Sequence, residues 1–294
     1  MNLFIFGIGY TGKYVAQRHV ARGNSVFGTV RSRAKAEALS APGLTARMFG
    51  PDGRDSEIES DLTASDALLV SVPPGIGGDP VLALYAKQIA AAPNLRWIGY
   101  LSTIGVYGDH QGAWVDEQTP AMPVHVRSRE RANAEQAWLA FGTANNIAVD
   151  VLRLAGIYGP GQNQLVQLAK GTARRIIKPG QVFNRTHVED IARVIDASLA
   201  KPRSDKHGAI YNVTDNEPAP PQDVVAFAAA LCGIEPPPEV SLENAGLTEM
   251  GRSFYAESKR VRNDLIRDAL GVTLAYPTYR EGLTALRAGG DGPR

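Results

Sequence analysis

Short apolar runs alternate along the chain with stretches in which apolar residues recur every three or four positions. The runs are too short for helices and are rich in valine, isoleucine, leucine and phenylalanine, as expected for strands buried on both faces of a sheet. They predict strands at 3–6, 25–30, 44–49, 67–72, 96–101, 149–154 and 210–213. The amphipathic stretches predict helices at 12–22, 34–39, 80–92, 165–169, 187–200, 222–231, 263–270 and 279–286, and one that begins at 127.

Strands that alternate with helices form parallel sheets through right-handed crossovers. The expected fold class is therefore α/β, with a doubly wound parallel sheet. We expect the last residues, 289–294, to be disordered, because they form a terminal segment rich in glycine with one proline.

The first predicted strand runs directly into Gly7-Ile8-Gly9-Tyr10-Thr11-Gly12, a G-x-G-x-x-G turn that a helix pattern follows. Gly7 allows the tight turn, Gly9 lets a pyrophosphate approach the backbone, and Gly12 lets the helix pack close to the strand. The amides and the positive end of the helix dipole then face the phosphates. A glycine-rich surface turn is the alternative, but the flanking strand and helix favour the dinucleotide site of a Rossmann fold.

The end of the second strand indicates which dinucleotide is bound. An NAD site of this type places an acidic residue there for the ribose 2′-hydroxyl, whereas this chain has Arg31 and Ser32 and no acid before Glu37. Arg31 can bind a 2′-phosphate with a bidentate fork, and Ser32 can add a hydroxyl. We expect NADP(H) as the preferred cofactor and NAD(H) as the second option. The alternative is that both residues are solvated and open the next helix.

Two further strand ends are candidates for contact with the cofactor. Val72 and Pro73 end the strand at 67–72, and Ser102 follows the strand at 96–101. Ligands of open α/β sheets bind outside the carboxyl ends of the strands, so we expect these three residues to line the cofactor site.

Composition excludes several classes of function. The 294 residues carry a formal net charge of +1, which gives no bulk attraction to nucleic acid or to an anionic membrane. Cys232 is the single cysteine, so an internal disulfide and a cysteine metal site are excluded, and the five histidines have no metal-ligand spacing. The N-terminus lacks the basic flank of a signal peptide. We expect a cytoplasmic protein without metal, nucleic-acid or membrane partners.

Three later segments carry specific motifs. Ser102–Gly108 follows a predicted strand, Arg153 opens an R-x-x-x-I-Y-G-P-G turn that ends at Gly161, and His187–Ala192 has the pattern H-V-x-D-x-A. Together with the glycine turn, these motifs resemble the extended short-chain dehydrogenase/reductase superfamily, in its NAD-dependent epimerase/dehydratase branch. The resemblance covers nearly the whole chain. It implies a nicotinamide cofactor on the N-terminal sheet and a small-molecule substrate under a smaller C-terminal lid.

The resemblance also implies a division into two domains. Residues 1–155 and about 183–215 would form the NADP-binding domain, and about 156–182 with 216–294 the substrate-binding domain. Dimerisation through helices near 80–92 and 127–141 is usual in the family, which implies a homodimer.

Catalytic Ser/Thr, Tyr and Lys residues are implied by the resemblance, and Thr103 matches the Ser/Thr position. The helix that would carry the Tyr-x-x-x-Lys pair has Arg127 at the tyrosine position and Arg131 at the lysine position. Arginine stays protonated, so Arg127 cannot shuttle a proton, although it could clamp a substrate carboxylate or phosphate. Arg131 could still hold ribose hydroxyls or a phosphate. The alternative is that both arginines lie on the solvated face of the helix.

This departure makes the chain resemble the atypical, YeeZ-like members of the superfamily, and it leaves the proton donor open. Tyr107, Tyr158 and His125 are further candidates, although packed tyrosines and a solvated loop histidine are the simpler interpretations. The basic stretch that ends at Arg185 is either a solvated surface or an anion site for the substrate.

Two functions follow from the sequence. The first is an NADP(H)-dependent oxidoreductase or epimerase/dehydratase-like enzyme that acts on a small polar substrate, sugar-derived or anionic. The second is a non-catalytic NADP(H)-binding sensor or regulatory protein that has lost the proton-shuttle tyrosine.

Overall fold

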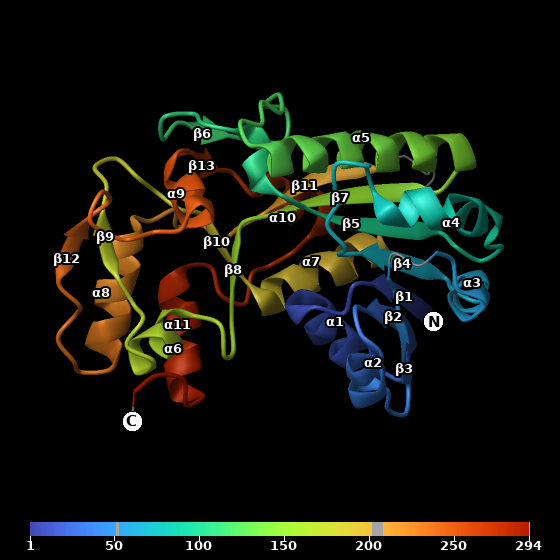
Figure 1. Ribbon diagram of the computed structural model, residues 1–294, viewed down its shortest axis with the longest axis horizontal. Coiled ribbons are helices and arrows are strands. Elements are labelled where there is room, and N and C mark those ends of the chain that lie inside the picture. Colours follow the sequence, from blue (N-terminus) through green and yellow to red (C-terminus); the bar gives the residue numbers. More distant parts are fainter. Residues whose placement is uncertain (51–52, 202–207, 294) are drawn as a thin grey trace. The chain divides into compact units, whose positions relative to one another are not determined.

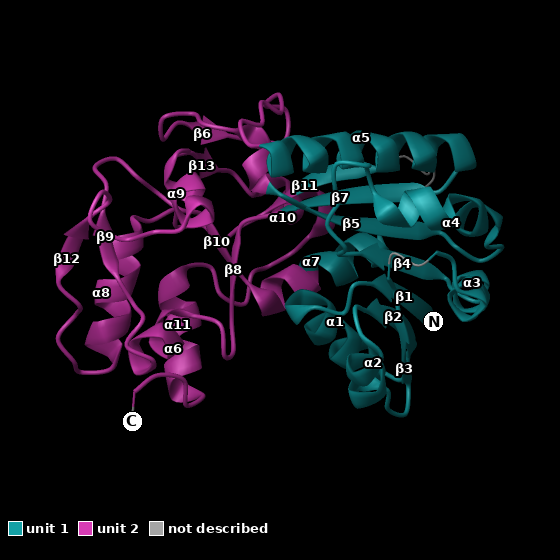
Figure 2. Ribbon diagram, viewed as in Figure 1, with its two compact units in different colours: residues 1–103, 126–153, 194–211 teal, residues 104–125, 154–193, 212–294 magenta. Residues whose placement is uncertain are grey.

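The computed structural model describes residues 1–50, 53–201 and 208–293. The chain folds into two compact units, each assembled from three segments (Figure 2). Unit 1 comprises residues 1–103, 126–153 and 194–211, and unit 2 comprises residues 104–125, 154–193 and 212–294.

Unit 1 is built on a seven-stranded sheet with the strand order β11-β7-β5-β4-β1-β2-β3. Its strands are β1 (Asn2–Phe6), β2 (Ser25–Val30), β3 (Leu44–Met48), β4 (Ala67–Val70), β5 (Trp97–Thr103), β7 (Ala148–Leu154) and β11 (Ala209–Val213). The pairings among β1 to β5 are all parallel. The strand order reverses at β1, and ligands of such sheets bind where the order reverses.

Helices cover both faces of this sheet (Figure 1). One face carries α1 (Tyr10–Ala21) and α2 (Arg33–Leu39), and the other carries α3 (Ser56–Thr63), α4 (Pro80–Ala91) and α5 (Val126–Asn145). On the second face, Phe4 and Phe6 of β1 pack in one buried cluster with Tyr85 of α4 and Trp138 of α5. Because both faces are covered, the strands are apolar on both sides, and the doubly wound fold expected from the sequence is confirmed.

The predicted start of the helix at Pro80 is confirmed, and Asp79 explains it. The Asp79 carboxylate accepts the backbone N–H groups of Val81 and Leu82 at 2.9 and 3.1 Å, and also the indole N–H of Trp138 at 3.0 Å. Burial raises the pKa of this carboxyl group. Asp79 therefore joins the first turn of α4 to the middle of α5.

Unit 2 contains three two-stranded parallel ladders. They pair β8 (Gly156–Tyr158) with β10 (Arg185–His187), β9 (Arg175–Ile177) with β12 (Glu239–Ser241), and β6 (Trp114–Val115) with β13 (Arg260–Val261). The helical elements that begin in this unit are η1 (Ile104–Tyr107), α6 (Gln164–Ala169), α7 (Val188–Ala200), α8 (Pro221–Leu231), α9 (Glu249–Tyr255), α10 (Asp264–Leu270) and α11 (Tyr279–Ala288). A buried cluster that includes Leu165, Val224 and Leu283 joins α6, α8 and α11.

The division into units differs from the domains expected from the sequence. Residues 104–125 and 183–193 belong to unit 2, whereas we expected them in the cofactor-binding domain. The reason is strand pairing, since β6 pairs with β13 and β10 pairs with β8. Unit 2 is therefore assembled from three parts of the chain and is not a C-terminal lid alone.

The expected disorder at 289–294 is wrong for the residues that the structure describes there, 289–293. The Asp291 carboxylate accepts the backbone N–H of Gly161 at 3.0 Å and the side-chain amide of Asn163 at 2.6 Å. Arg287 also donates to the carbonyl of Pro293 at 2.8 Å. These contacts order the segment after α11, and Arg294 lies outside the described residues.

Within the described ranges, no helix has the length and apolar character needed to cross a bilayer. Nor do three or more potential metal ligands gather anywhere in 1–50, 53–201 or 208–293.

Candidate functional site

The glycine turn lies where the strand order reverses. Gly7 has a positive φ of +92°, and a Cβ atom on it would lie 3.1 Å from the side chain of Val72. Thr29 of β2 holds the turn from the other side, because its hydroxyl accepts the N–H of Gly7 at 3.0 Å and its carbonyl accepts the N–H of Ile8 at 2.7 Å. The structure thus brings two predicted site segments together, the glycine turn and the residues after β4.

Gly9 and Gly12 differ in what the fold requires of them. A Cβ atom on Gly12 would lie 2.6 Å from the carbonyl oxygen of Gly7, a contact that only glycine avoids. At Gly9, φ is −85°, and a Cβ atom would meet nothing within 4 Å. The fold therefore needs glycine at position 12 but not at position 9. Gly9 has no side chain and borders open space, and a pyrophosphate needs both features to approach the backbone closely.

The N-terminus of α1 is suited to an anion. No side chain caps it, and its first turn contains no acidic residue, whereas Ser32, Asp55 and Asp79 cap α2, α3 and α4. The uncapped end leaves the positive pole of the helix dipole and the first-turn amides of α1 facing the same region. A nicotinamide dinucleotide, whose pyrophosphate is anionic, therefore fits the residues that are present.

The predicted residues of the turn would contribute mainly through their backbone. Ile8, Thr11 and Gly12 are buried, Tyr10 is half-buried, and Gly9 is exposed. The side chains of Ile8 and Thr11 are buried, so they would not face a cofactor, and the turn stays a prediction as the cofactor site.

The end of β2 carries the expected basic residue in an accessible position. Arg31 is exposed. Ser32 is the N-cap of α2, and its hydroxyl accepts the N–H of Lys35 at 3.4 Å. The first turn of α2 contains no acidic residue. The local charge is compatible with a phosphate, and both residues remain predictions as cofactor contacts.

The ends of β4 and β5 place the remaining cofactor candidates. Val72 is half-buried beside Gly7, and Pro73 is exposed. Ser102 is buried, and its hydroxyl donates to the buried carboxylate of Glu135, which also pairs with Arg153 at 2.7 Å. Ser102 therefore ties β5 to α5, and its contact with a cofactor stays a prediction.

The two arginines of α5 behave differently. Arg127 is exposed, as expected for a residue on the solvated face. Arg131 is half-buried, donates to the carbonyl oxygen of Leu101 at 2.7 Å, and lies over the Tyr100 ring with its Cζ 5.6 Å from the ring centroid. These contacts fix Arg131 at the carboxyl end of β5. Its acceptor Leu101 lies two residues before the half-buried Thr103.

Tyr107 and Tyr158, the two candidate proton donors, are both packed in the interior, which agrees with the simpler interpretation of their sequence context. The hydroxyl of Tyr107 donates to the side chain of Asn212 at 2.8 Å. Tyr158 is buried, and burial raises the pKa of its phenol above the usual value. A raised pKa makes a tyrosine a poorer proton shuttle near neutrality.

One Tyr-x-x-x-Lys spacing does occur outside α5, at Tyr255 and Lys259, and we did not identify it from the sequence. Tyr255 ends α9, and its buried ring packs edge-on against Phe183 at 5.1 Å. Lys259 donates to the carbonyl of Gly108 at 2.6 Å and pairs with Glu257 at 2.7 Å. The helix ends before Lys259, so the spacing does not place the two side chains on one helix face.

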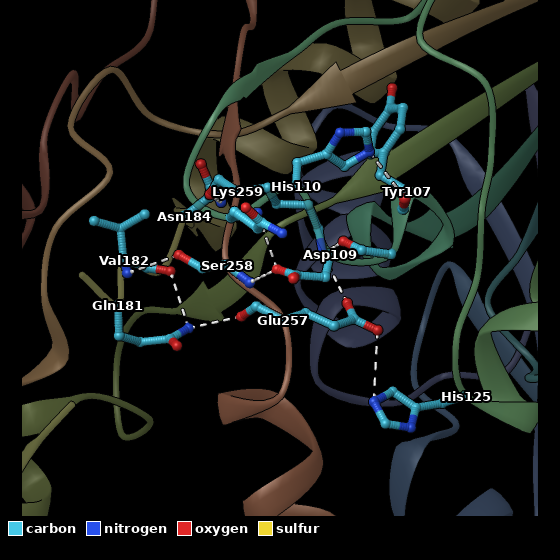
Figure 3. A network of polar contacts seen from close by, with 12 residues as sticks. Tyr107, Asp109, His110, His125, Gln181, Val182, Asn184, Glu257, Ser258 and Lys259 are labelled. Carbon is cyan, nitrogen blue, oxygen red and sulfur yellow. Dashed lines mark hydrogen bonds and ion pairs between the residues drawn. The ribbon is translucent and has the colours of Figure 1, made fainter. Parts of the chain in front are cut away.

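A polar network in unit 2 surrounds Lys259 (Figure 3). Lys259 pairs with Oε2 of the Glu257 carboxylate, and the other carboxylate oxygen, Oε1, lies 3.5 Å from Nε2 of His125. Asp109 accepts the backbone N–H of Ser258 at 2.8 Å, and this hydrogen bond lowers the pKa of Asp109. His125 is therefore a partly solvated loop histidine, as the simpler interpretation expected, whose Nε2 is buried beside a carboxylate.

Arg185 does not form an exposed anion site. It is buried, donates to the carbonyls of Phe183 and Ala219 at 2.9 and 3.2 Å, and lies 5.9 Å from the centroid of the Tyr279 ring. Near it, burial raises the pKa of Asp215 to about 8. No pattern in the sequence pointed to Asp215, because its burial arises only from tertiary packing.

Comparisons with known proteins agree with this geometry. The family model described as NAD dependent epimerase/dehydratase family matches residues 81–214. Protein YeeZ of Escherichia coli (strain K12) is 31% identical over 284 residues, which cover 93% of this chain and 95% of that protein. The structure of a functionally unknown conserved protein from Silicibacter pomeroyi DSS is 50% identical, with a TM-score of 0.87 and 98% of each chain covered.

A more distant structure shares the fold. UDP-glucuronic acid 4-epimerase from Bacillus cereus, in complex with UDP-glucuronic acid and NAD, is 17% identical with a TM-score of 0.77 and 98% of each chain covered. Since the similarity to YeeZ extends over nearly the whole chain and the family model covers its middle, the protein belongs to the NAD-dependent epimerase/dehydratase family of extended short-chain dehydrogenases/reductases.

Proposed function

We propose that this protein binds NADP(H) at the glycine turn and acts as an oxidoreductase or an epimerase/dehydratase-like enzyme. The observation that carries the proposal is Gly9, which the fold itself does not need, since its φ is ordinary and a Cβ would meet nothing. The uncapped N-terminus of α1 supports it, because it offers amides and a positive pole to a pyrophosphate.

The preference for NADP(H) rests on the end of β2. Arg31 is exposed, no acid lies in the first turn of α2, and the hydroxyl of Ser32 is at the start of that helix. A 2′-phosphate would gain a bidentate partner from Arg31. NAD(H) would find no carboxylate there for its ribose hydroxyls.

The bound cofactor would exchange a hydride with a substrate carbon that bears oxygen. Thr103, at the end of β5, would donate a hydrogen bond to that oxygen. Arg131 keeps further N–H donors beside the one that binds Leu101, and these would hold ribose hydroxyls or a phosphate. The exposed guanidinium of Arg127 would bind a carboxylate or phosphate of the substrate. A small polar, anionic or sugar-derived substrate suits these groups, and UDP-glucuronic acid, bound by the distant 4-epimerase, belongs to that class.

Calorimetric titration of NADPH and NADH tests the cofactor assignment. We expect NADPH to bind at least tenfold more tightly, and Arg31→Asp to weaken NADPH by about 10- to 100-fold while NADH changes little. Arg96→Asp is the matched control, because Arg96 is exposed at the amino end of β5, on the opposite edge of the sheet. Equal affinities for both dinucleotides in the unmodified protein would contradict the NADP(H) assignment.

The second candidate is an NADP(H)-binding sensor without catalysis. It is favoured by one observation, the exposed Arg127 at the position where the family carries its tyrosine. A panel of carbonyl compounds and sugar nucleotides, followed by NADPH absorbance, separates the two. The enzyme predicts turnover of at least one compound and a marked loss in Thr103→Val. The sensor predicts tight NADPH binding with no turnover of any compound.

A further inference from the structure

His125 and Glu257 form a pair that no role yet explains. The imidazole Nε2 lies 3.5 Å from Oε1 of Glu257 (Figure 3). Both atoms are buried, and neither forms a hydrogen bond with any residue in the described part of the chain. Two buried polar atoms that face only each other interact most favourably when Nε2 carries a proton directed at the carboxylate.

Glu257 is itself held rigidly. Its Oε2 binds the ammonium of Lys259 at 2.7 Å, and that ammonium also donates to the carbonyl of Gly108 at 2.6 Å. The backbone carbonyl of Glu257 accepts the side-chain amide of Gln181 at 2.7 Å. The carboxylate therefore has a fixed position on which the imidazole can be oriented.

The other ring nitrogen of His125 is available for chemistry. The side chain is 36% exposed although Nε2 is buried, and Figure 3 shows Nδ1 on the side of the ring away from Glu257. An imidazole fixed through one nitrogen by a carboxylate, with its other nitrogen accessible, has the arrangement of a general acid–base.

The other described histidines do not have this arrangement. His19 is buried and uses both ring nitrogens, with Asp196 at 3.1 Å and Asn24 at 3.3 Å. His187 is packed against two tyrosine rings, and burial lowers its pKa to about 4. His110 uses Nε2 on the carbonyl of Tyr107, and His207 lies outside the described residues.

The chain itself places His125 close to the position of the missing tyrosine. His125 is the residue immediately before α5 and lies two residues before Arg127. Two peptide units limit the distance between these Cα atoms to about 7.6 Å. One turn further along α5, Arg131 binds the carbonyl of Leu101 at the carboxyl end of β5.

We propose that His125 is the acid–base residue of the reaction, with Glu257 as its positioning residue. The proposal rests on the proposed oxidoreductase function. In carbonyl reduction, hydride from the reduced nicotinamide dinucleotide bonds to the carbonyl carbon while the Nδ1–H bond of the imidazolium breaks and its proton bonds to the oxygen. The carbonyl becomes an alcohol, the dinucleotide is oxidised, and the imidazole is left neutral until it takes a proton from water. In the reverse direction, Nδ1 accepts the alcohol proton.

Kinetics of His125→Asn give the first test, with NADPH and the panel compound that the unmodified protein turns over fastest. General acid–base catalysis contributes about 10²- to 10⁴-fold, so we expect kcat to fall by at least 100-fold while the Kd for NADPH changes less than threefold. His110→Asn is the matched control, as a half-buried histidine of the same unit. If His125→Asn keeps more than a third of the kcat, the proposal is overturned and the enzyme assignment stands. If the unmodified protein turns over no compound, both are overturned.

A spectroscopic test does not depend on turnover. Two-bond ¹H–¹⁵N correlation spectra of ¹⁵N-histidine-labelled protein report which ring nitrogen carries the proton. We expect the Nε2–H tautomer for His125 at high pH, and a mixture of tautomers in Glu257→Gln with kcat reduced about tenfold or more. Melting curves confirm that this variant folds, since its amide oxygen can still accept from Lys259. An Nδ1–H tautomer in the unmodified protein would overturn the positioning role of Glu257.

Discussion

Two of the three glycines of the turn, Gly9 and Gly12, allow the effects of an added methyl group on folding and on cofactor binding to be measured separately. Gly9→Ala adds a Cβ where nothing lies within 4 Å and where φ is −85°. Alanine at such a position gains about 0.4–1 kcal/mol by restricting the unfolded chain, and as a poorer N-cap it loses a similar amount. The free energy of unfolding should therefore change by less than about 1 kcal/mol.

The same methyl group should strongly weaken the dinucleotide complex. It would occupy the space through which the pyrophosphate approaches the first-turn amides of α1. Hydrogen bonds from amides to a charged phosphate contribute about 1.5–3 kcal/mol each, so losing one or two costs about 3 kcal/mol, or roughly 100-fold in Kd. Calorimetric titration with NADPH, with thermal melting of the free protein in parallel, measures both quantities.

Gly12→Ala gives the contrasting result. Its Cβ would lie 2.6 Å from the carbonyl of Gly7, and such overpacking costs about 1–3 kcal/mol. Its melting temperature should fall even without cofactor. Gly77→Ala, an exposed glycine with open space around it, is the control that should change neither quantity. If Gly9→Ala folds normally and binds NADPH as tightly as the unmodified protein, the reasoning about the turn is refuted.

Two further predictions concern buried carboxyl groups in the free protein. Burial raises the pKa of Asp215 to about 8, so the folded state binds more protons than the unfolded state between about pH 4 and 8, and stability falls as the pH rises through this window. Asp215→Asn should therefore match the unmodified protein near pH 4 and exceed it by on the order of 5 kcal/mol at pH 8 in denaturant titrations. Although burial acts to raise the pKa of Asp196, hydrogen bonds from His19 and Arg18 outweigh it and hold the pKa at about 2. Its contribution, about 2 kcal/mol, is present above pH 4 and is lost towards pH 2, so Asp196→Asn should be destabilised at pH 7 and unchanged near pH 2; equal stability at pH 7 would contradict this.

Features that depend on local sequence were predictable. The apolar runs gave the strands of the sheet because each strand is covered on both faces, and the glycine turn was identified because strand, turn and helix are consecutive. The helix α3 was missed, since Ile58 and Leu62 are its only buried apolar residues and its pattern is too short to recognise. Asp55 at its N-cap was a signal that could have been used.

Features that depend on distant parts of the chain were not predictable. The partner of His125 lies beyond α9, and nothing near either residue in the sequence connects them. The arginines of α5 could not be distinguished by pattern, because the contacts that hold Arg131 but not the exposed Arg127 come from Tyr100 and Leu101, which lie about 30 residues earlier in the chain. The burial of Asp215 likewise follows from packing against residues far away in sequence.

The segment after α11 has a practical consequence for handling the protein. Asn163 caps α6 by accepting the N–H of Val166 at 3.1 Å, and Asp291 holds the amide end of the same side chain. Proteolytic trimming that removes Asp291 would take away one of the two acceptors of this amide, leaving the carbonyl of Gly159 at 2.8 Å, and would also remove the acceptor of the Gly161 N–H. The trimming would thereby weaken the start of a helix more than a hundred residues upstream. A preparation that has lost its last few residues would then differ little in mass from the full chain but would melt at a lower temperature.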